Sequence, residues 1–513
     1  MNDKVKFGWV PGPLAPKELV QECSDLYSAH YGTWSDSAPH SRGQRVRLSA
    51  QRIRDEWLDE DSRIATAKLN GALIGYAIVI PAKLCGNGIV SWVTQLVVHK
   101  DYRQRDIGKT LLFSVWGFST HFCWGLITAS PYAIRALEKA TRRRCVSERI
   151  ATHKGRLQKL GARKIPYVAQ SEALDVSRST SKINTRFFVD HGDLEATVAG
   201  VVAKDKPWNL GMIDEGWEWF AFTFHDQDQI SLDSNEIAGM LAASDQITKD
   251  AYSRMPIGES QPWVRFADKE AAFVVSSCDL RTSDRVLDLG CGSGRHAIRL
   301  AELGLAVTGV DYVGSFIDAA RQDASKKQSI HAEFVEADCR DVVLRSEFDA
   351  VICLYDVVGT YAENDENRKI LQNLARHLKR GGKALISVMN FELTARRATN
   401  FFNLGEQPDK LLELPASPTM ETTGDVFDPR YYLIEEETKV VYRKEQFSAG
   451  QSLPVELIVR DRRFRTAEIE EMCRDAGLDV VWSRFVRAGH WDEPLTNDDD
   501  HAKEILILCN KSL

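Results

Sequence analysis

The residues with the clearest chemical meaning lie in one short turn that holds Gly290, Gly292 and Gly294. An apolar run precedes the turn, which is typical of a buried parallel strand, and apolar residues at helical spacing follow it. A second strand-like run then ends in Asp311. This order places backbone N–H groups at the start of a helix and a carboxylate at the tip of the next strand. That arrangement predicts a binding site for an adenosine-type cofactor.

Two kinds of cofactor compete for this site. Residues 292–297 fit the dinucleotide fingerprint with Ala in its last place, and Asp311 lies near the required distance. Three features favour S-adenosylmethionine instead. Asp288 precedes the glycines inside the strand, Asp338 follows a third strand, and residues 348–354 predict a fourth strand that ends at the site. Together they resemble the class I S-adenosylmethionine-dependent methyltransferases, and the resemblance covers most of the second half of the chain.

The resemblance implies which residues contact that cofactor. The Asp311 carboxylate would accept hydrogen bonds from both ribose hydroxyls, and Asp338 would meet the adenine amino group. Asp288 would orient the turn and the methionine end of the cofactor. The implied cofactor-binding residues are Asp288, Gly290, Gly292, Gly294, Asp311, Tyr312, Asp338, Cys339 and Leu354.

The methyl acceptor is expected just beyond the fourth strand, at Tyr355 and Asp356. Methyl transfer requires in-line alignment of the nucleophile and a dry pocket, and a general base where the nucleophile still carries a proton. His296 and Asp356 are the candidate bases, so Tyr355, Asp356 and His296 form the predicted catalytic set of this half. The stretch does not match the N-P-P-Y-type motif of enzymes that methylate amino groups of nucleic-acid bases. The sequence therefore gives no specific argument for that reaction.

The remaining second half completes a sheet. Residues 383–389 predict a fifth strand, and residues 480–485 and 504–509 predict the last two. Between them, residues 390–465 contain three strand-like runs, which indicate an antiparallel insertion over the active site. The expected fold is a Rossmann-like sheet of seven strands with an antiparallel lid insertion.

A basic turn opens a helix in the first half, directly after a strand-like run. The order resembles the GNAT N-acetyltransferase superfamily, whose Q/R-x-x-G-x-G/A turn binds the pyrophosphate of acetyl-coenzyme A at a helix N-terminus. Arg103 and Gly108 match this pattern. Asp106 replaces the first glycine, and its carboxylate would oppose a pyrophosphate unless it points away or caps the helix, for which Asp is well suited. The implied cofactor-binding residues are Leu96, Val98, Arg103, Gln104, Arg105, Asp106, Ile107, Gly108 and Lys109.

A second motif departs further from that superfamily. Residues 130–139 resemble its N-x-x-A-x-x-x-Y-x-K helix, but Leu137 occupies the position of the Tyr that often serves as general acid. Tyr132 lies nearby and is the predicted catalytic hydroxyl. Glu218, in an aromatic strand-like run, can either pack in the sheet or face a substrate cleft. The departure leaves two possibilities open, an active acetyltransferase and a domain that binds an acyl-coenzyme A without catalysis.

Charge is unevenly distributed along the 513 residues. Residues 1–230 hold 31 Lys+Arg against 25 Asp+Glu, and the remainder holds 35 against 48. The segment from Arg142 to Lys164 is strongly basic, with Glu148 as its single acid. It is either a solvated helix pair or a surface for RNA, DNA or a phosphorylated substrate. Aromatic residues that stack on bases are absent from it, which weakens the nucleic-acid interpretation.

Composition sets the broad class. A hydrophobic content of 43% and a charged content of 27% describe a globular protein, and the length fits two or three domains. No stretch approaches 18 apolar residues, and the start resembles no secretory leader, so we expect a cytoplasmic protein without a membrane span. The ten cysteines form no C-x-x-C pair and are interpreted as buried thiols in a reducing compartment, with no metal site predicted.

These observations predict an α/β chain of two domains. A GNAT-like mixed α/β domain is expected over residues 1–228 and a methyltransferase domain over residues 229–513. The predicted function is a bifunctional transferase that uses S-adenosylmethionine and acetyl-coenzyme A on an amine-bearing small molecule. One alternative is an enzyme that modifies RNA or DNA. Another is a methyltransferase whose GNAT-like domain senses coenzyme A without catalysis. The sequence leaves the oligomeric state open.

Overall fold

The computed structural model describes residues 5–84, 88–204, 207–230, 234–252, 264–417 and 426–512. They fall into two compact units. The first comprises Met1–Ala251 with Phe447–Leu457, and the second comprises Tyr252–Gln446 with Ile458–Leu513. Both units mix helices and strands, which confirms the predicted α/β class. The domain boundary at residues 228/229 stays a prediction, and by its contacts most of helix α8 (Ser234–Tyr252) belongs to the first unit.

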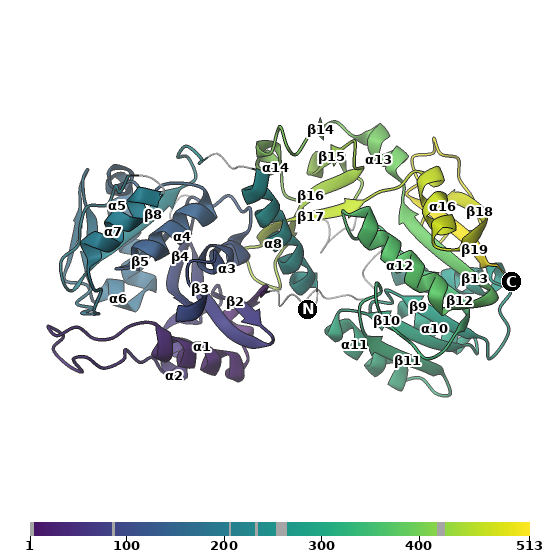
Figure 1. The fold of residues 1–513 in the computed structure, drawn as a ribbon, viewed down its shortest axis with the longest axis horizontal. Helices are drawn as coiled ribbons and strands as arrows, with labels where there is room; N and C mark the ends of the chain where they lie inside the picture. Colours follow the sequence, from purple (N-terminus) through teal and green to yellow (C-terminus); the bar gives the residue numbers. More distant parts are fainter. Residues whose placement is uncertain are drawn as a thin grey trace. The chain divides into compact units, whose positions relative to one another are not determined.

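The first unit is built on an eight-stranded sheet in the order β1-β2-β3-β4-β5-β8-β7-β6 (Figure 1). Among the described strands of this sheet, only β4 and β5 pair in parallel, and the paired register runs from Val90 to Val93 of β4. Beyond Val93, β4 continues to Val98 without a partner in β5. The two strands thus separate toward their carboxyl ends. The strands are β1 (Lys6–Pro11), β2 (Arg63–Leu69), β3 (Ala72–Lys83), β4 (Ile89–Val98), β5 (Cys123–Thr128), β6 (Ala173–Val176), β7 (Ser181–Asn184) and β8 (Trp217–Phe224).

Helices cover both faces of this sheet (Figure 1). Tyr76 and Ile78 of β3 pack in one core cluster with residues of α1 and α2. A Cβ at the adjacent Gly75 would meet Leu111 and Ile107 of α3 on the opposite face. Alternation along one strand therefore assigns α1 and α2 to one face and α3 to the other. The helices are α1 (Lys17–His30), α2 (Ala50–Trp57), α3 (Ile107–Trp116), α4 (Pro131–Thr141), α5 (Ser147–Lys164), α6 (Pro166–Ala169) and α7 (Leu194–Lys204).

The second unit contains the predicted seven-stranded sheet, in the order β11-β10-β9-β12-β13-β19-β18. The first five strands are parallel, and β19 runs antiparallel to both of its neighbours. The strand order reverses between β9 and β12, and ligands bind at such a switch point in open α/β sheets. The strands are β9 (Arg285–Leu289), β10 (Ala306–Asp311), β11 (His331–Glu336), β12 (Phe348–Cys353), β13 (Leu378–Met389), β18 (Leu478–Val486) and β19 (Glu504–Lys511).

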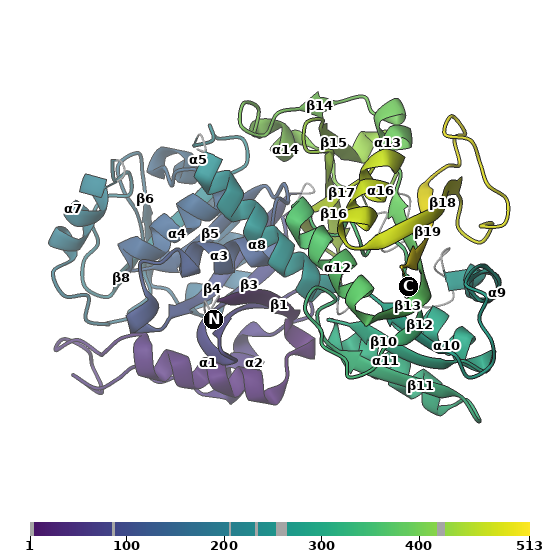
Figure 2. The same cartoon turned by 45° about the vertical axis from the view of Figure 1, so that its right-hand side comes forward.

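Two core clusters pack against opposite faces of this sheet (Figure 2). One includes Leu371 of α12 and Ile469 of α16, packed with Val351 and Ile386. The other brings α9, α10 and α11 onto the alternate residues of the same strands. Burial on both faces explains the nearly continuous apolar runs in the sequence of these strands. The helices are α9 (Ala267–Ser277), α10 (Arg295–Glu302), α11 (Gly314–Ser325), α12 (Asn364–His377) and α16 (Thr466–Asp475).

The excursion after β13 forms a separate four-stranded sheet in the order β14-β15-β16-β17 (Figures 1 and 2). Its strands β15 and β16 pair antiparallel, as expected, whereas β14 and β15 pair in parallel. The short β14 lay outside the predicted strand-like runs. The elements are α13 (Phe391–Arg397), β14 (Phe401–Phe402), α14 (Asp409–Glu413), β15 (Tyr432–Glu435), β16 (Val440–Phe447) and β17 (Val455–Arg462).

Within the described part of the chain, no helix combines the length and the apolar content needed to cross a bilayer. The cysteines that the structure describes are all free and buried, in agreement with their interpretation as thiols. Those residues are Cys23, Cys123, Cys145, Cys278, Cys291, Cys339, Cys353, Cys473 and Cys509.

Candidate active sites

The glycine turn of the second unit links β9 to α10 and requires glycine at three positions. Gly290, Gly292 and Gly294 have φ of +80°, +54° and +82°, in the left-handed region that other residues adopt only under strain. A Cβ at Gly290 would lie 2.3 Å from Val357. A Cβ at Gly292 would meet nothing within 4 Å, so open space adjoins this turn. The backbone here can approach a ligand closely.

Asp311, at the end of β10, is fixed against that turn. One carboxylate oxygen accepts a hydrogen bond from the Gly292 N–H at 2.9 Å, and the other accepts from the Val313 N–H at 2.9 Å. Burial raises the pKa of Asp311, and these N–H donors oppose the increase. Each carboxylate oxygen keeps a further lone pair. The residue can therefore accept two hydroxyl groups of a ribose while it holds the turn.

Asp288 and Arg295 flank the turn with polar atoms that lack partners. Asp288 Oδ2 and Arg295 Nη1 are both buried and have no hydrogen-bond partner in the part of the chain that the structure describes. Burial raises the pKa of Asp288 to about 7, and the nearby Arg295 opposes that increase. A buried unpaired polar atom is costly unless a ligand satisfies it. One free carboxylate oxygen and one free guanidinium N–H complement the ammonium and carboxylate groups of a methionine-like moiety.

The other predicted cofactor residues of this unit lie around the same strand ends. Tyr312 follows Asp311 and is 39% exposed, whereas Cys339 and Leu354 are buried. Asp338 is paired with Arg340, at 2.6 Å between Oδ2 and Nη2. The Asp338 carboxylate is thus already engaged, and an adenine amino group would have to share it with Arg340. Asp338 and Arg340 are only two residues apart, so this ion pair could have been predicted from the sequence.

The loop after β12 has an unusual backbone. Tyr355 and Asp356 have φ of +60° and +66°, so two consecutive non-glycine residues adopt the left-handed region. Such strain persists only where the surrounding structure imposes it, and it concentrates at functional sites. The Tyr355 N–H donates to Ser387 Oγ of β13 at 2.7 Å, which holds the loop. Both residues of the predicted acceptor site are therefore positioned by tertiary contacts.

His296 and Tyr355 meet through Glu270, a residue of α9 that the sequence did not single out. Glu270 accepts a hydrogen bond from the Tyr355 hydroxyl, bonds His296 Nε2 at 2.7 Å, and accepts from the Gly489 N–H at 2.8 Å. Burial favours a higher Glu270 pKa, but the bonds to His296 and Tyr355 lower it. Burial also lowers the pKa of His296. The three side chains form one buried network, with the Arg295 guanidinium 4.0 Å from the Tyr355 ring centroid.

The basic turn of the first unit lies between β4 and α3. Gln104 and Asp106 have φ of +59° and +56°, in the left-handed region, and Asp106 stands where the motif has its first glycine. The capping role considered for Asp106 is wrong, because its side chain makes no capping hydrogen bond. Its carboxylate instead lies 3.5 Å from the Lys109 ammonium and 3.6 Å from that of Lys139. A left-handed residue directs its side chain away from the helix start, and two lysines attract it there.

A pocket of about 800 Å³ opens where β4 and β5 separate. The basic turn lines one end, and Tyr31, Phe187 and Glu218 line it with the start of α4. Of the residues predicted to bind acetyl-coenzyme A, Arg105 does not line the pocket, and its guanidinium lies over the Tyr102 ring. The predicted residues that line it are Leu96, Val98, Arg103, Gln104, Asp106, Ile107, Gly108, Lys109 and Tyr132.

Glu218 of β8 is a buried carboxyl group that lines this pocket. Its side chain is 6% exposed, and the Thr185 hydroxyl donates to Oε2 at 2.7 Å. Burial raises the pKa of Glu218 to about 7, which suits a general base near neutral pH. His191 lines the same pocket, and burial lowers its pKa. His191 was missed because it lies in an irregular segment with no motif around it.

The predicted hydroxyl donor, Tyr132, also lines this pocket but is 48% exposed. Ser130 caps α4 by accepting the Ala133 N–H at 3.4 Å, so Tyr132 occupies the first turn of the helix. Leu137, in place of the superfamily's Tyr, is fully buried in the core. Leu137 therefore supplies no proton, and the role of the Tyr132 hydroxyl as general acid stays a prediction.

The basic segment is largely committed to internal contacts. Arg142 and Arg143 are buried, and Arg143 donates to the His225 carbonyl oxygen at 2.9 Å. Arg144 pairs with Glu138 at 3.1 Å, and Lys164 pairs with Asp59 at 3.0 Å. These contacts remove cations from any phosphate-binding surface. Nucleic-acid binding through this segment stays a prediction, and these internal contacts weaken it.

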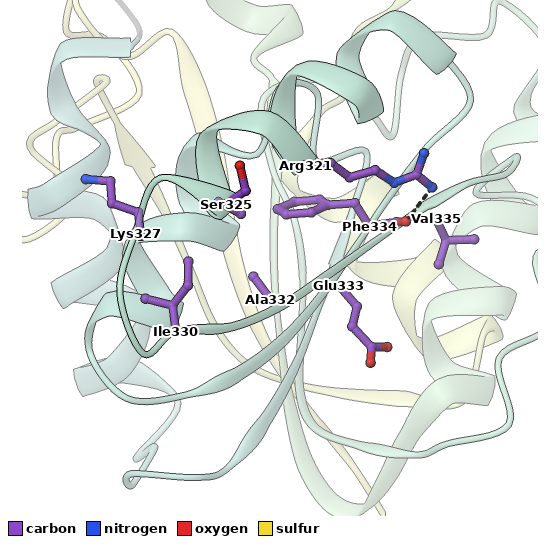
Figure 3. Close-up of a pocket in the computed structure, with 9 residues that line it drawn as sticks. Arg321, Ser325, Lys327, Ile330, Ala332, Glu333, Phe334 and Val335 are labelled. Carbon is purple, nitrogen blue, oxygen red and sulfur yellow. Dashed lines mark hydrogen bonds between the residues drawn. The ribbon is translucent and has the colours of Figure 1, made fainter.

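A second hollow, of about 620 Å³, lies at the edge strand β11 and helix α11 (Figure 3). The Arg321 guanidinium reaches across it and donates to the Phe334 carbonyl oxygen at 2.9 Å. None of its lining residues belongs to the predicted sites. We assign no chemistry to it.

Comparisons with known proteins find one domain match in each half of the chain. A model described as a methyltransferase domain matches residues 286–382, and the acetyltransferase (GNAT) family model matches residues 22–122. A stretch of 101 residues is 38% identical to the cypemycin N-terminal methyltransferase of a Streptomyces species, covering 20% of this chain and 40% of that protein. Another of 133 residues is 31% identical to the glycine/sarcosine N-methyltransferase of Aphanothece halophytica, covering 26% and 50%.

Among solved structures, the CcbJ methyltransferase from Streptomyces caelestis is 17% identical with a TM-score of 0.37, covering 48% of this chain and 90% of that one. The chain spans half or less of the length of the two curated relatives. The family models nonetheless establish the domain content. The chain carries a GNAT acetyltransferase domain in its first half and a methyltransferase domain in its second half, as the sequence predicted.

Proposed function

We propose that the chain is a bifunctional transferase that methylates and acetylates amine-bearing small molecules, with S-adenosylmethionine and acetyl-coenzyme A as donors. The observation that carries the methyl donor is the set of groups around the glycine turn. Asp311 presents paired carboxylate oxygens, and Asp288 and Arg295 present buried polar atoms without partners in the described structure. A ribose diol and an amino-acid zwitterion would satisfy all of them.

The chain's own residues would then prepare the acceptor. Bound S-adenosylmethionine would supply an electrophilic methyl group, and the acceptor nitrogen forms its new bond with that carbon as the carbon–sulfur bond breaks, leaving the electron pair on sulfur. The strained loop at Tyr355 and Asp356 positions the acceptor beside the turn, and the Glu270 network orients the Tyr355 hydroxyl. Asp356 is the group that takes the nitrogen's proton.

The names of the two curated relatives are consistent with transfer to nitrogen. One is named as the N-terminal methyltransferase of cypemycin and the other as the N-methyltransferase of glycine and sarcosine. Because the matches cover 40% and 50% of those proteins, they support nitrogen as the acceptor without specifying the molecule. The acidic balance of residues 231–513, with 35 Lys+Arg against 48 Asp+Glu, also suits a cationic small molecule better than a polyanion.

For the acetyl donor, the support is the pocket at the separated strands β4 and β5. The N–H groups at the start of α3 suit a pyrophosphate, and Glu218 lies in the same pocket as a base for an amine. Acetyl-coenzyme A, when bound, would supply an activated thioester. Glu218 would accept the proton of the attacking amine, and the thiolate leaving group would be protonated by Tyr132 or by water.

Gly108 provides the test of this donor site. A Cβ at Gly108 would already lie 3.4 Å from the Ala136 Cβ, so Gly108→Trp would fill the turn. We expect calorimetry of the full chain to show no acetyl-coenzyme A binding in Gly108→Trp and unchanged S-adenosylmethionine binding. Unaltered acetyl-coenzyme A affinity would contradict the proposed turn. Binding to the wild type without any acetylated product would favour the sensing alternative.

The substitution Asp106→Gly is expected to increase the affinity for acetyl-coenzyme A. In Asp106→Gly the carboxylate that opposes a pyrophosphate is removed, and Lys109 and Lys139 lose their competing anion. Charges at a helix N-terminus contribute about 0.3–1 kcal/mol each, so we expect acetyl-coenzyme A to bind about fivefold more tightly. Titration calorimetry measures this, with Asp106→Asn separating charge from backbone effects. Weaker binding in Asp106→Gly would show that the carboxylate itself assists the donor.

A further inference from the structure

Two carboxyl groups of the second unit share a feature that the glycine turn does not explain. Asp356 follows β12 and is half-buried, whereas Glu504 begins β19 and is 4% exposed. Asp356 Oδ1 and Glu504 Oε2 are both buried without a hydrogen-bond partner among the residues that the structure describes. A buried carboxylate without a partner is strongly destabilised, so a ligand is expected to satisfy it.

One serine of β13 connects the two carboxyl groups. Ser387 Oγ accepts the Tyr355 N–H at 2.7 Å, which holds the loop that carries Asp356. Ser387 also lowers the pKa of Glu504, and the strands β13 and β19 are in register with Met389 opposite Glu504. Both acids therefore lie at the same end of the sheet, beside the loop where the methyl acceptor is placed.

Two arginines near these acids already pair with other carboxylates. Arg443 donates to Glu445 at 2.7 Å and to Asp461, and Arg463 donates to Asp461 at 2.9 Å. Arg463 also donates to the Thr394 hydroxyl at 2.7 Å. Neither arginine donates a hydrogen bond to Asp356 Oδ1 or Glu504 Oε2. The fold thus brings two arginines near these acids, but Asp356 Oδ1 and Glu504 Oε2 stay available to hydrogen-bond a ligand.

We infer that the methyl acceptor is an aliphatic ammonium ion, held at its charged nitrogen by the Asp356 and Glu504 carboxylates. This inference rests on the proposed methyl transfer and narrows its substrate class. An ammonium has up to three N–H donors and can serve both oxygens at once. Neutral phenols and alcohols supply a single donor and no charge, so they satisfy this pair of acids poorly.

The protonation of the two acids gives the inference a pH signature. Burial raises the pKa of Asp356, and the negative charges of Asp461 and Glu504 raise it further. The positive charges of Arg463 and Arg443 oppose this increase. Burial and the charge of Glu270 raise the pKa of Glu504 to about 8. Interactions with Ser387, Arg295 and Lys503 partly oppose this increase. An arriving cation must displace these protons. Acceptor affinity therefore rises with pH toward about 8, as long as the amine itself stays protonated.

The experiment uses the full chain, a small-molecule extract of cells and S-adenosylmethionine with an isotopically labelled methyl group. Products are separated by cation and anion exchange at a pH of about 2, where carboxyl groups are protonated and an aliphatic amine carries a positive charge even in an amino acid. The label is counted in each fraction. We expect the label in the cation-bound fraction. In Glu504→Gln and Asp356→Asn we expect at least about 30-fold less of that label, because a buried charged hydrogen bond is lost. The exposed Asp323→Asn is the control and should match the wild type.

Retention of S-adenosylmethionine binding in both variants, measured by calorimetry, shows that the fold and donor site persist. Label in the neutral or anionic fractions would overturn the ammonium inference while leaving methyl transfer intact. Cationic label that survives in both variants would overturn the role of the two acids. Absence of any labelled product would instead overturn the proposed function on which the inference rests.

Discussion

Replacing Asp311 with alanine should lower the affinity for S-adenosylmethionine by about 100-fold. The Asp311 carboxylate is oriented by the Gly292 and Val313 N–H groups, each at 2.9 Å, so its remaining lone pairs are fixed toward the turn. Hydrogen bonds to a charged group contribute about 1.5–3 kcal/mol each, and two of them to a ribose account for a loss of that size. Titration calorimetry on the full chain measures it.

The controls for this result separate recognition from damage to the turn. Asp311→Asn keeps one acceptor oxygen and the side-chain volume, so it should lose less affinity than the alanine variant. Asp318→Ala removes an exposed acid of α11 that pairs only with Arg321, and it should bind like the wild type. An Asp311→Ala protein with an unchanged dissociation constant would show that the donor does not use this strand tip.

The second large effect is expected at Glu218 in the acetyltransferase domain. Glu218→Gln should reduce kcat for acetyl transfer by about 10²–10⁴-fold, the usual contribution of a positioned general base. Acetyl-coenzyme A affinity should not change, because Glu218 belongs to β8 and is not part of the basic turn. Incorporation of a labelled acetyl group measures the rate. The exposed Glu195→Gln, on α7, is the matched control.

The pH dependence distinguishes a base from a structural role. Burial raises the pKa of Glu218 to about 7, so the catalytic carboxylate form is lost as pH falls below that value. The wild-type kcat/KM should therefore fall about tenfold per pH unit below about 7 and level off above it. In Glu218→Gln this limb should disappear. A variant that keeps the same limb would exclude Glu218 as the titrating base.

The cofactor motifs were predictable because their parts are close in sequence. The turn at Gly290 and Gly292 and the acid Asp311 belong to one strand–turn–helix–strand unit, so local periodicity locates all of them. The seven-stranded sheet followed from the same reasoning, since strands buried on both faces have continuous apolar runs. Asp106 shows the limit of local rules. Aspartate is a good N-cap, but here a left-handed backbone and the Lys139 ammonium determine where its side chain lies.

The acceptor sites could not be predicted in the same way. Glu270 meets His296 and Tyr355 only because α9, α10 and the loop after β12 pack together, and no sequence spacing encodes that contact. Glu504 reaches the same strand ends from the last strand of the chain. Such groups become visible only when tertiary structure shows which buried polar atoms lack a partner. The sequence therefore predicted the donors better than the acceptors.

The central claim is that one chain transfers both groups to amines, and one measurement tests it most directly. The full chain is incubated with a small-molecule extract and both donors, each isotopically labelled, and the products are analysed by mass spectrometry. The account predicts amines that have gained a methyl group, absent in Asp311→Ala, and amines that have gained an acetyl group, absent in Gly108→Trp. Labelled nucleic acid with no labelled small amine, or no label from either donor, would contradict it.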